Sequence, residues 1–263
     1  MLENQLDKFW NIEKIATDKP KSTDEIKCET HILNTVRRNE TGRYVVRLPF
    51  RTSKKRLDES RIGALRRLSS LERTLNANVT LKDEYTQILE EYLKLGHMSV
   101  VETPDTIGYY MPHHAVIKES SISTKVRVVF DAKTSSGMSL NNMLLIGHTI
   151  QDKLFAHLIC FRTYRIVLTA DIEKMYRQVV LHQDDRKYQQ ILWHRNNKLE
   201  TFQINRFTFG VSFSPFLTIR AIKELADDES HIHSRAAEII KTQLYVDDLL
   251  TDAETVDKAR TVR

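Results

Sequence analysis

The chain has 263 residues, of which 41% are hydrophobic and 29% are charged, and its formal net charge is +5. This composition is typical of a globular protein and excludes an intrinsically disordered chain. The two cysteines, far apart in the chain, rule out a disulfide framework, so we expect an intracellular protein. No 18-residue apolar run is present and the N-terminus (MLENQLDKFW) is acidic and polar, so we expect neither a membrane span nor a signal peptide.

The first third of the chain predicts a basic, mostly helical region. Ser22-Thr23-Asp24-Glu25 fits a capping box at the start of a short helix. Residues 43–50 alternate weakly and the pattern ends at Pro49, which predicts an edge strand. Two amphipathic helices follow over 59–75 and 81–95, with Gly96 placed to cap the second. Arginines and lysines crowd residues 37–73, which indicates a surface for phosphates or a solvated basic face.

From residue 109 the pattern changes to strands alternating with helices. The strands 113–118 and 125–131 are predicted to form a hairpin. The later elements, in chain order, are helix 150–161 with Leu154, Phe155, Leu158 and Ile159 on its apolar face, strand 165–171, strands near 189–195 and 200–206 separated by Asn196-Asn197, helix 214–226, hairpin 242–251 and a last helix from about Glu254. Strand–helix–strand units on one antiparallel sheet predict an α+β fold.

Two sites on separate strands carry acids. Tyr245-Val246-Asp247-Asp248 lies between apolar residues, which predicts a tight turn with both acids at its tip. Asp171 ends a strand whose apolar residues predict that it is buried. Like charges side by side are costly unless cations neutralise them, and hard carboxylate oxygens suit Mg²⁺ or Mn²⁺. The pattern therefore predicts a two-ion phosphoryl-transfer site, with a solvated acidic hairpin as the alternative.

Four segments, in this order, resemble motifs of retroelement reverse transcriptases. They are STKVRVVFD (123–131), LTADIEKMYRQVVL around Asp171, FGVSFSPF (209–216) and LYVDDLL around Asp247. Residues 44–50, 91–98 and 109–145 are more similar still to Pao/BEL-type LTR retrotransposons. The resemblance implies that residues 41–263 are the fingers and palm of a reverse transcriptase, with an antiparallel palm sheet backed by helices. Residues 1–40 would be a loosely attached linker.

The same resemblance implies an RNA-directed DNA polymerase. It would add deoxynucleotides to the 3′-end of a primer on an RNA or DNA template, using two Mg²⁺ ions that Mn²⁺ could replace. Other parts of a parent polyprotein would be possible partners, in a cytoplasmic particle or the nucleus. Since the family continues with a primer grip and a thumb, we expect these residues alone to bind Mg²⁺ and nucleic acid weakly and to extend primers barely.

The resemblance also implies residue roles at the acid site. Asp171 and Asp247 would ligate both metal ions, with the backbone carbonyl of Ile172 nearby, and Asp248 would reach a metal transiently or fix the hairpin. Arg127 would lie against the incoming triphosphate, where a planar guanidinium suits phosphate oxygens. Lys125 would add charge there or remain a solvated lysine of the hairpin, as would Lys118.

Three further residues are implied to contact the nucleotide or the template. Tyr176 would lie beneath the sugar and exclude a 2′-hydroxyl, with core packing as the alternative. Phe209 replaces the glutamine of better-known retroviral relatives, so its contact with the nucleotide would be apolar. Gly210 would let the template or nucleotide approach the backbone closely.

Other interpretations remain beside this one. A non-catalytic nucleic-acid-binding remnant that keeps the fold is the main alternative, whereas the Ser-Pro and Tyr-Val-Asp-Asp context argues against a nuclease. Asp184-Asp185 begins a predicted helix, where acids are electrostatically favoured, so we interpret this pair as structural. Zinc is not expected, because no set of histidines and cysteines has converging ligand spacing.

Overall fold

A computed structural model describes residues 20–54, 57, 60–103, 108–118, 126–132, 139–151, 154–163 and 166–262. Helices and small sheets alternate along the chain, which agrees with the expected mixed α and β content. No helix in these ranges combines the length and the apolar character that a bilayer crossing would require.

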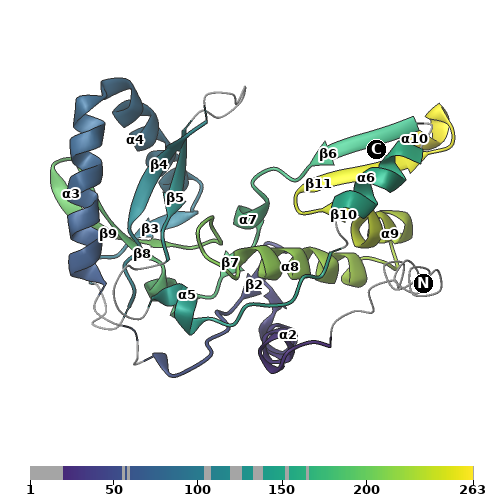
Figure 1. The fold of residues 1–263 in the computed structure, drawn as a ribbon, viewed down its shortest axis with the longest axis horizontal. Coiled ribbons are helices and arrows are strands. Elements are labelled where there is room, and N and C mark those ends of the chain that lie inside the picture. Colours follow the sequence, from purple (N-terminus) through teal and green to yellow (C-terminus); the bar gives the residue numbers. More distant parts are fainter. Residues whose placement is uncertain are drawn as a thin grey trace, which may run out of the picture.

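One end of the molecule, on the left in Figure 1, consists of two long helices and two small antiparallel sheets. The helices are α3 (Arg61–Ala77) and α4 (Val79–Lys94), which pack on each other and on the strands. The first sheet has the order β3 (Met98–Val100), β9 (Lys198–Ile204), β8 (Gln190–Arg195), and the second pairs β4 (His113–Ile117) with β5 (Val126–Phe130).

The opposite end, on the right in Figure 1, carries a third antiparallel sheet. Its order is β10 (Leu244–Tyr245), β11 (Asp248–Ala253), β6 (Ile166–Asp171). Three helices contact β11, namely α6 (Leu154–Thr163), α9 (Ser234–Gln243) and α10 (Val256–Val262).

The elements between the two ends are short, apart from the helices α2 (Thr23–Thr35) and α8 (Ser214–Asp228). The short helices are α5 (Leu140–Met143), α7 (Met175–Gln178) and the 3₁₀ helix η2 (Gln183–Tyr188). A fourth sheet has the order β1 (Arg37–Arg38), β2 (Tyr44–Val46), β7 (Val180–Leu181), and β2 and β7 run parallel.

Several local signals in the sequence act as predicted. Ser22 and Glu25 form the capping box of α2, each satisfying a backbone N–H of the other. Gly96 follows α4 with a φ of +67°, a conformation that glycine adopts without steric cost. Asn196 and Asn197 join β8 to β9, both with positive φ, as the favoured two-residue hairpin turn requires.

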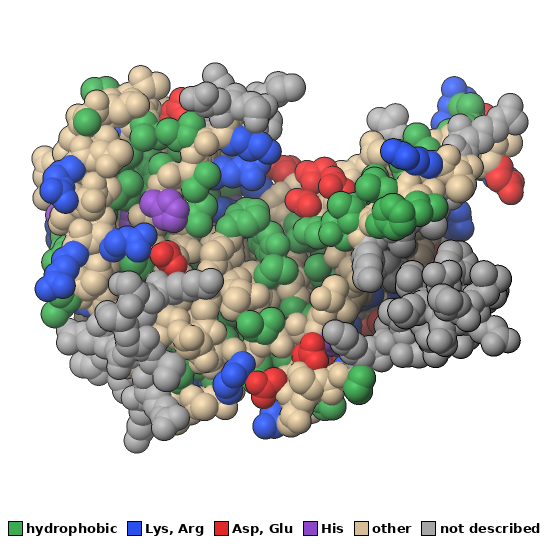
Figure 2. Space-filling model, viewed as in Figure 1, with side chains coloured by type: hydrophobic (Ala, Val, Ile, Leu, Met, Phe, Trp, Pro, Cys, Tyr) green, Lys and Arg blue, Asp and Glu red, His purple; other side chains and the backbone are tan. Residues whose placement is uncertain are grey.

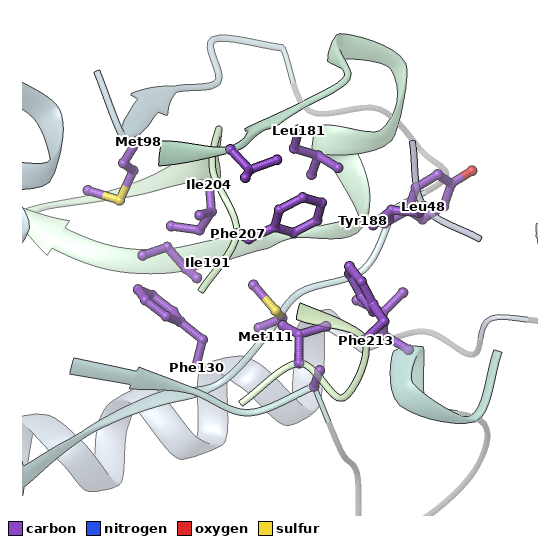
Figure 3. Packing of buried hydrophobic residues seen from close by; sticks show 14 of the residues in the cluster. Leu48, Met98, Met111, Phe130, Leu181, Tyr188, Ile191, Ile204, Phe207 and Phe213 are labelled. Atoms are coloured by element: carbon purple, nitrogen blue, oxygen red, sulfur yellow. The ribbon is translucent and has the colours of Figure 1, made fainter. Parts of the chain in front are cut away.

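The main core lies where the β3–β9–β8 sheet meets β5 and β7. Figure 3 shows Phe130, Ile191 and Ile204 pointing into this core, and Phe130 and Ile191 are fully buried. Burying side chains of this size stabilises a fold by about 1.5–3 kcal/mol each. No residue of β6, β10 or β11 belongs to this core in the described part of the chain, so the acid-bearing sheet is supported mainly by its own helices.

Three predictions about arrangement are wrong. The later strands, expected to share one antiparallel palm sheet, lie in two sheets within the described ranges, because β8 and β9 form a sheet with β3 whereas β6 pairs with β11. The strand over residues 44–46 is not an edge strand, because it pairs with β1 on one side and with β7 on the other. It ends before Pro49, so the proline does not interrupt either pairing. The N-terminal helix α2 is not loosely attached, because Cys28 and Ile32 are buried in the main core.

Two predictions about burial are also wrong. Strand β6 is not buried: it lies at the edge of its sheet, and Val167 is 44% exposed. The predicted apolar face of α6 does not pack, since Leu154, Phe155, Leu158 and Ile159 are all exposed. The helix instead presents the buried His157 to the sheet, where its ring lies 5.6 Å from that of Tyr245.

Candidate functional site

The β6–β11 pairing brings the three aspartates to one end of a sheet. Asp171, the last residue of β6, is the direct antiparallel partner of Asp248, the first residue of β11. Directly opposed residues share a face, with Cβ atoms about 5 Å apart. Asp247 precedes Asp248 in the turn, and its carbonyl accepts a hydrogen bond of 2.9 Å from the Ile172 N–H. The backbone therefore holds three carboxylates together.

The turn between β10 and β11 has an unusual conformation. Val246 has a φ of +57°, which is a genuine outlier for a β-branched residue. The side chain of Gln151 supports it: its Oε1 accepts from the Val246 N–H at 3.1 Å, and its Nε2 donates to the Leu244 carbonyl at 3.1 Å. Strained residues of this kind persist only where the surroundings over-determine them, and Gln151 supplies that support.

The three aspartates repel one another electrostatically. The pKa of Asp248 is raised above its ordinary value, first because its carboxyl is partly desolvated and then because Asp247 and Asp171 are nearby negative charges. In Figure 1 the acid-bearing ends of β6 and β11 face the rest of the molecule across a notch. Figure 2 shows acidic side chains gathered at this notch. A cation at this place would relieve the repulsion.

The donor set fits a hard divalent cation, because all three side chains are carboxylates. Within the described residues no group of three or more His, Cys, Asp or Glu is arranged so that it could hold a metal ion. The Ile172 carbonyl, the fourth expected ligand, accepts a hydrogen bond of 3.1 Å from the Met175 N–H. The backbone register brings the aspartates to the same end of the sheet.

Tyr176 and Phe209 form an aromatic pair beside the acids. Their ring centroids lie 4.8 Å apart at an interplanar angle of 72°. Phe209 is 46% exposed, and Tyr176 is half-buried. The pKa of Tyr176 is raised by burial and then by the charge of Asp247, so the phenol lies within the field of the aspartate cluster. The pair gives the site an apolar wall.

At position 210, next to this pair, the backbone conformation and its close surroundings require glycine. Its φ is +93°, and a Cβ added there would lie 1.7 Å from the Phe130 carbonyl oxygen. Asn141 fixes the loop by donating from Nδ2 to the Gly210 carbonyl and accepting from the Ser212 N–H at 3.0 Å. The glycine therefore lets the loop approach the end of β5, and its contact with template or nucleotide stays a prediction.

The remaining predicted residues lie on β5 or near it. Arg127 is exposed on the face of β5 opposite to the buried Val126, Val128 and Phe130, as its alternation predicted. Lys125 lies outside the described residues, so its predicted contact with the triphosphate stays a prediction.

The second acid pair is structural, as predicted from its position. Asp184 and Asp185 lie in the first turn of η2. Asp185 is 1% exposed and accepts hydrogen bonds of 3.0 Å from the Leu48 N–H and from Nζ of Lys54. Asp184 pairs with Arg47 at 2.8 Å. Both carboxylates therefore stabilise the packing of η2 against the chain near β2.

Sequence reasoning missed two residues that position the site, Gln151 and Asn141. Both are polar side chains that bond backbone groups far away in the chain. An isolated Gln or Asn carries no local pattern, so only the fold reveals such a role.

Comparisons with known proteins indicate the family and the fold of this chain. A family model described as reverse transcriptase (RNA-dependent DNA polymerase) matches residues 119–262. A solved structure of the foamy viral protease–reverse transcriptase in complex with double-stranded DNA is similar, with a TM-score of 0.50 and 18% sequence identity. The match covers 69% of this chain and 27% of that chain, so this chain spans about a quarter of that protein's length. No curated protein matches the sequence.

The family model covers more than half of the 263 residues, and its matched region includes both strands that carry the aspartates. The structural similarity independently indicates a reverse-transcriptase-like fold with mixed α and β content and antiparallel sheets. The chain belongs to the reverse transcriptase family.

Proposed function

We propose that the chain is the fingers and palm of an RNA-directed DNA polymerase from a Pao/BEL-type LTR retrotransposon. In this assignment the left end in Figure 1 is the fingers, and the sheet of β6, β10 and β11 with its helices is the palm. The observation that carries the proposal is the direct pairing of Asp171 with Asp248, with Asp247 in the adjoining turn. This arrangement suits transfer of a deoxynucleotide to a primer 3′-end on an RNA or DNA template.

The proposed roles follow from the position of each side chain. Asp171, Asp247 and the Ile172 carbonyl would hold two Mg²⁺ ions, or Mn²⁺ in their place, with Asp248 beside them. Bound ions would lower the pKa of the primer hydroxyl and neutralise the triphosphate and the leaving pyrophosphate. Arg127 would hold triphosphate oxygens from β5, with Lys125 as a further cation.

The aromatic pair would select and position the nucleotide. Tyr176 would pack beneath the deoxyribose and leave no room for a 2′-hydroxyl. Phe209, exposed and in contact with Tyr176, would provide an apolar surface for the nucleotide. Gly210 keeps this loop close to the end of β5 and so places Phe209 beside the strand that carries Arg127.

Divalent-ion binding tests the proposal independently of catalysis. Mn²⁺ binding, measured by electron paramagnetic resonance, should be lost in Asp171→Asn and Asp247→Asn and only weakened in Asp248→Asn. Asp252→Asn is the matched control, because Asp252 lies on the same strand and pairs with Val167, about 13 Å from Asp248. Undiminished Mn²⁺ affinity in Asp247→Asn would show that the site is assigned wrongly.

A primer-extension assay on RNA and DNA templates, with Mg²⁺ or Mn²⁺, tests the reaction itself. One observation favours the second candidate, a non-catalytic nucleic-acid-binding remnant: among the described residues no three carboxylates, histidines or cysteines are grouped so that they could hold a metal ion. Metal binding and extension that both depend on Asp247 would exclude the remnant. Template binding with no extension and no Mn²⁺ affinity would establish it.

A further inference from the structure

Three arginines from distant parts of the chain converge on the short segment Gln178–Leu181. Arg43 donates from Nη1 to the Gln178 side chain, and Arg186 donates from Nε to the Leu181 carbonyl at 3.1 Å. Arg206, two residues after β9, forms a backbone bridge with Val180. The guanidinium groups of Arg43 and Arg186 therefore contact the segment that contains β7, and both lie close enough to Arg206 for their charges to lower its pKa.

The cluster is under-neutralised. Nε and Nη1 of Arg206 are buried, and neither has a hydrogen-bond partner among the described residues. In that part of the chain no carboxylate forms an ion pair with Arg43, Arg186 or Arg206. The pKa of Arg206 is lowered, first by burial and then by the charges of Arg43 and Arg186. Buried donors without acceptors destabilise a fold, so the arrangement is unfavourable unless an anion completes it.

The positive field extends from this cluster towards the aspartates. The pKa of His97 is lowered to about 4, first by burial and then by the charges of Arg177, Arg206 and Lys174. Arg177 lies over the ring of Tyr92, and Lys174 is three residues after Asp171. Arg177, Arg206 and Lys174 thus all lie within electrostatic reach of His97, and of these Lys174 is paired with Glu91 at 2.6 Å.

We propose that Arg43, Arg186 and Arg206 form a binding site for a phosphodiester of a nucleic-acid strand. A guanidinium group can match two phosphate oxygens, and an oxyanion beside Arg206 would accept from one of its two orphaned N–H groups while neutralising the neighbouring arginines. The assignment of this phosphate to a nucleic-acid strand rests on the proposed function. The anion site itself rests only on the three arginines.

Thermal unfolding in phosphate, compared with chloride at equal ionic strength and without divalent ions, tests the anion site. Inorganic phosphate should raise the melting temperature of the wild-type chain by several degrees more than chloride. Arg206→Met and Arg43→Met should lose at least half of this phosphate-specific shift. Arg66→Met is the matched control and should retain it, because Arg66 is exposed on α3. Arg43 is also exposed, so its variant should fold even where Arg206→Met does not.

Oligonucleotide binding then identifies the source of the phosphate. The slope of log affinity against log salt should fall by about 0.7–0.9 in Arg43→Met, the value for one lost phosphate contact. A full phosphate-specific shift in both variants would overturn the anion site. Two results would overturn the assignment of the phosphate to a nucleic-acid strand. One is an unchanged salt slope in Arg43→Met. The other is stronger binding of a nucleoside triphosphate than of an oligonucleotide at equal phosphate concentration. None of these measurements requires metal ions or catalysis, so their failure is distinct from failure of the proposed polymerase activity.

Discussion

Replacing Gly210 by alanine should destabilise the fold strongly, whereas the same replacement at Gly63 should not. At Gly210 the φ of +93° is unfavourable for an L-residue by about 1–2 kcal/mol. The new Cβ would also lie 1.7 Å from the Phe130 carbonyl oxygen, a backbone atom that cannot rotate away. Overpacking of this kind costs about 1–3 kcal/mol more. We therefore expect Gly210→Ala to lose roughly 2–5 kcal/mol of unfolding free energy.

Gly63 provides the internal comparison. It lies in α3, and a Cβ there would meet nothing within 4 Å. Gly63→Ala should therefore stabilise the chain by about 0.5–1 kcal/mol, the helix propensity difference. Urea denaturation followed by far-UV circular dichroism measures both variants. If Gly210→Ala unfolds at the wild-type midpoint, the close approach of the Phe209–Gly210 loop to β5 is wrong. Equal destabilisation by both variants would show that the effect is not specific to Gly210.

Three further predictions concern single side chains. In an active preparation, Tyr176→Val should raise ribonucleotide incorporation relative to deoxynucleotide, measured by competitive primer extension, and unchanged discrimination would make Tyr176 a packing residue. Burial lowers the pKa of His113 from 6.5 to about 4, so the unfolded state binds the proton first and stability is lost as pH falls from 6.5 to 4. His113→Gln should remove about 3 kcal/mol of this pH dependence, measured by urea denaturation at several pH values. Parallel curves of unfolding free energy against pH for the variant and the wild type would refute this. Asp185→Asn should cost about 1–3 kcal/mol in the same assay because a buried carboxylate loses its charge-assisted bond to Lys54, whereas Asp184→Asn, at an exposed pair, should change stability by under about 1 kcal/mol.

The sequence predicts those elements that local chemistry specifies. The Asn196-Asn197 turn identifies the β8–β9 hairpin because asparagine tolerates positive φ, and Ser22 marks the start of α2 because its hydroxyl accepts a backbone N–H. Helices α3 and α4 follow from leucine and tyrosine spacing. The aspartate turn was also predictable from local sequence, because two acids between apolar residues favour a strand reversal.

The arrangement of these elements could not be predicted from local patterns. The apolar residues of α6 predict a buried face, yet the helix turns His157 to the sheet and leaves Phe155 72% exposed. Nothing near Tyr44–Val46 indicates that β7, more than 130 residues later, pairs with it. The pairing of Asp171 with Asp248 likewise depends on register between distant strands. Periodicity specifies a residue's face within an element, and long-range pairing decides what that face meets.

The two hydrogen bonds from Gln151 to the aspartate turn have a consequence for the order of folding. They join positions 93 and 95 residues apart, so the entropy of closing a long loop must be offset before the turn gains this support. A hairpin usually forms early because its contacts are local, but β10 has only two residues and Val246 opposes the required conformation. The turn should therefore acquire its native shape after α6 has docked on β11. In native-state hydrogen exchange, the Val246 amide should open at lower free energy than amides of the β8–β9 hairpin.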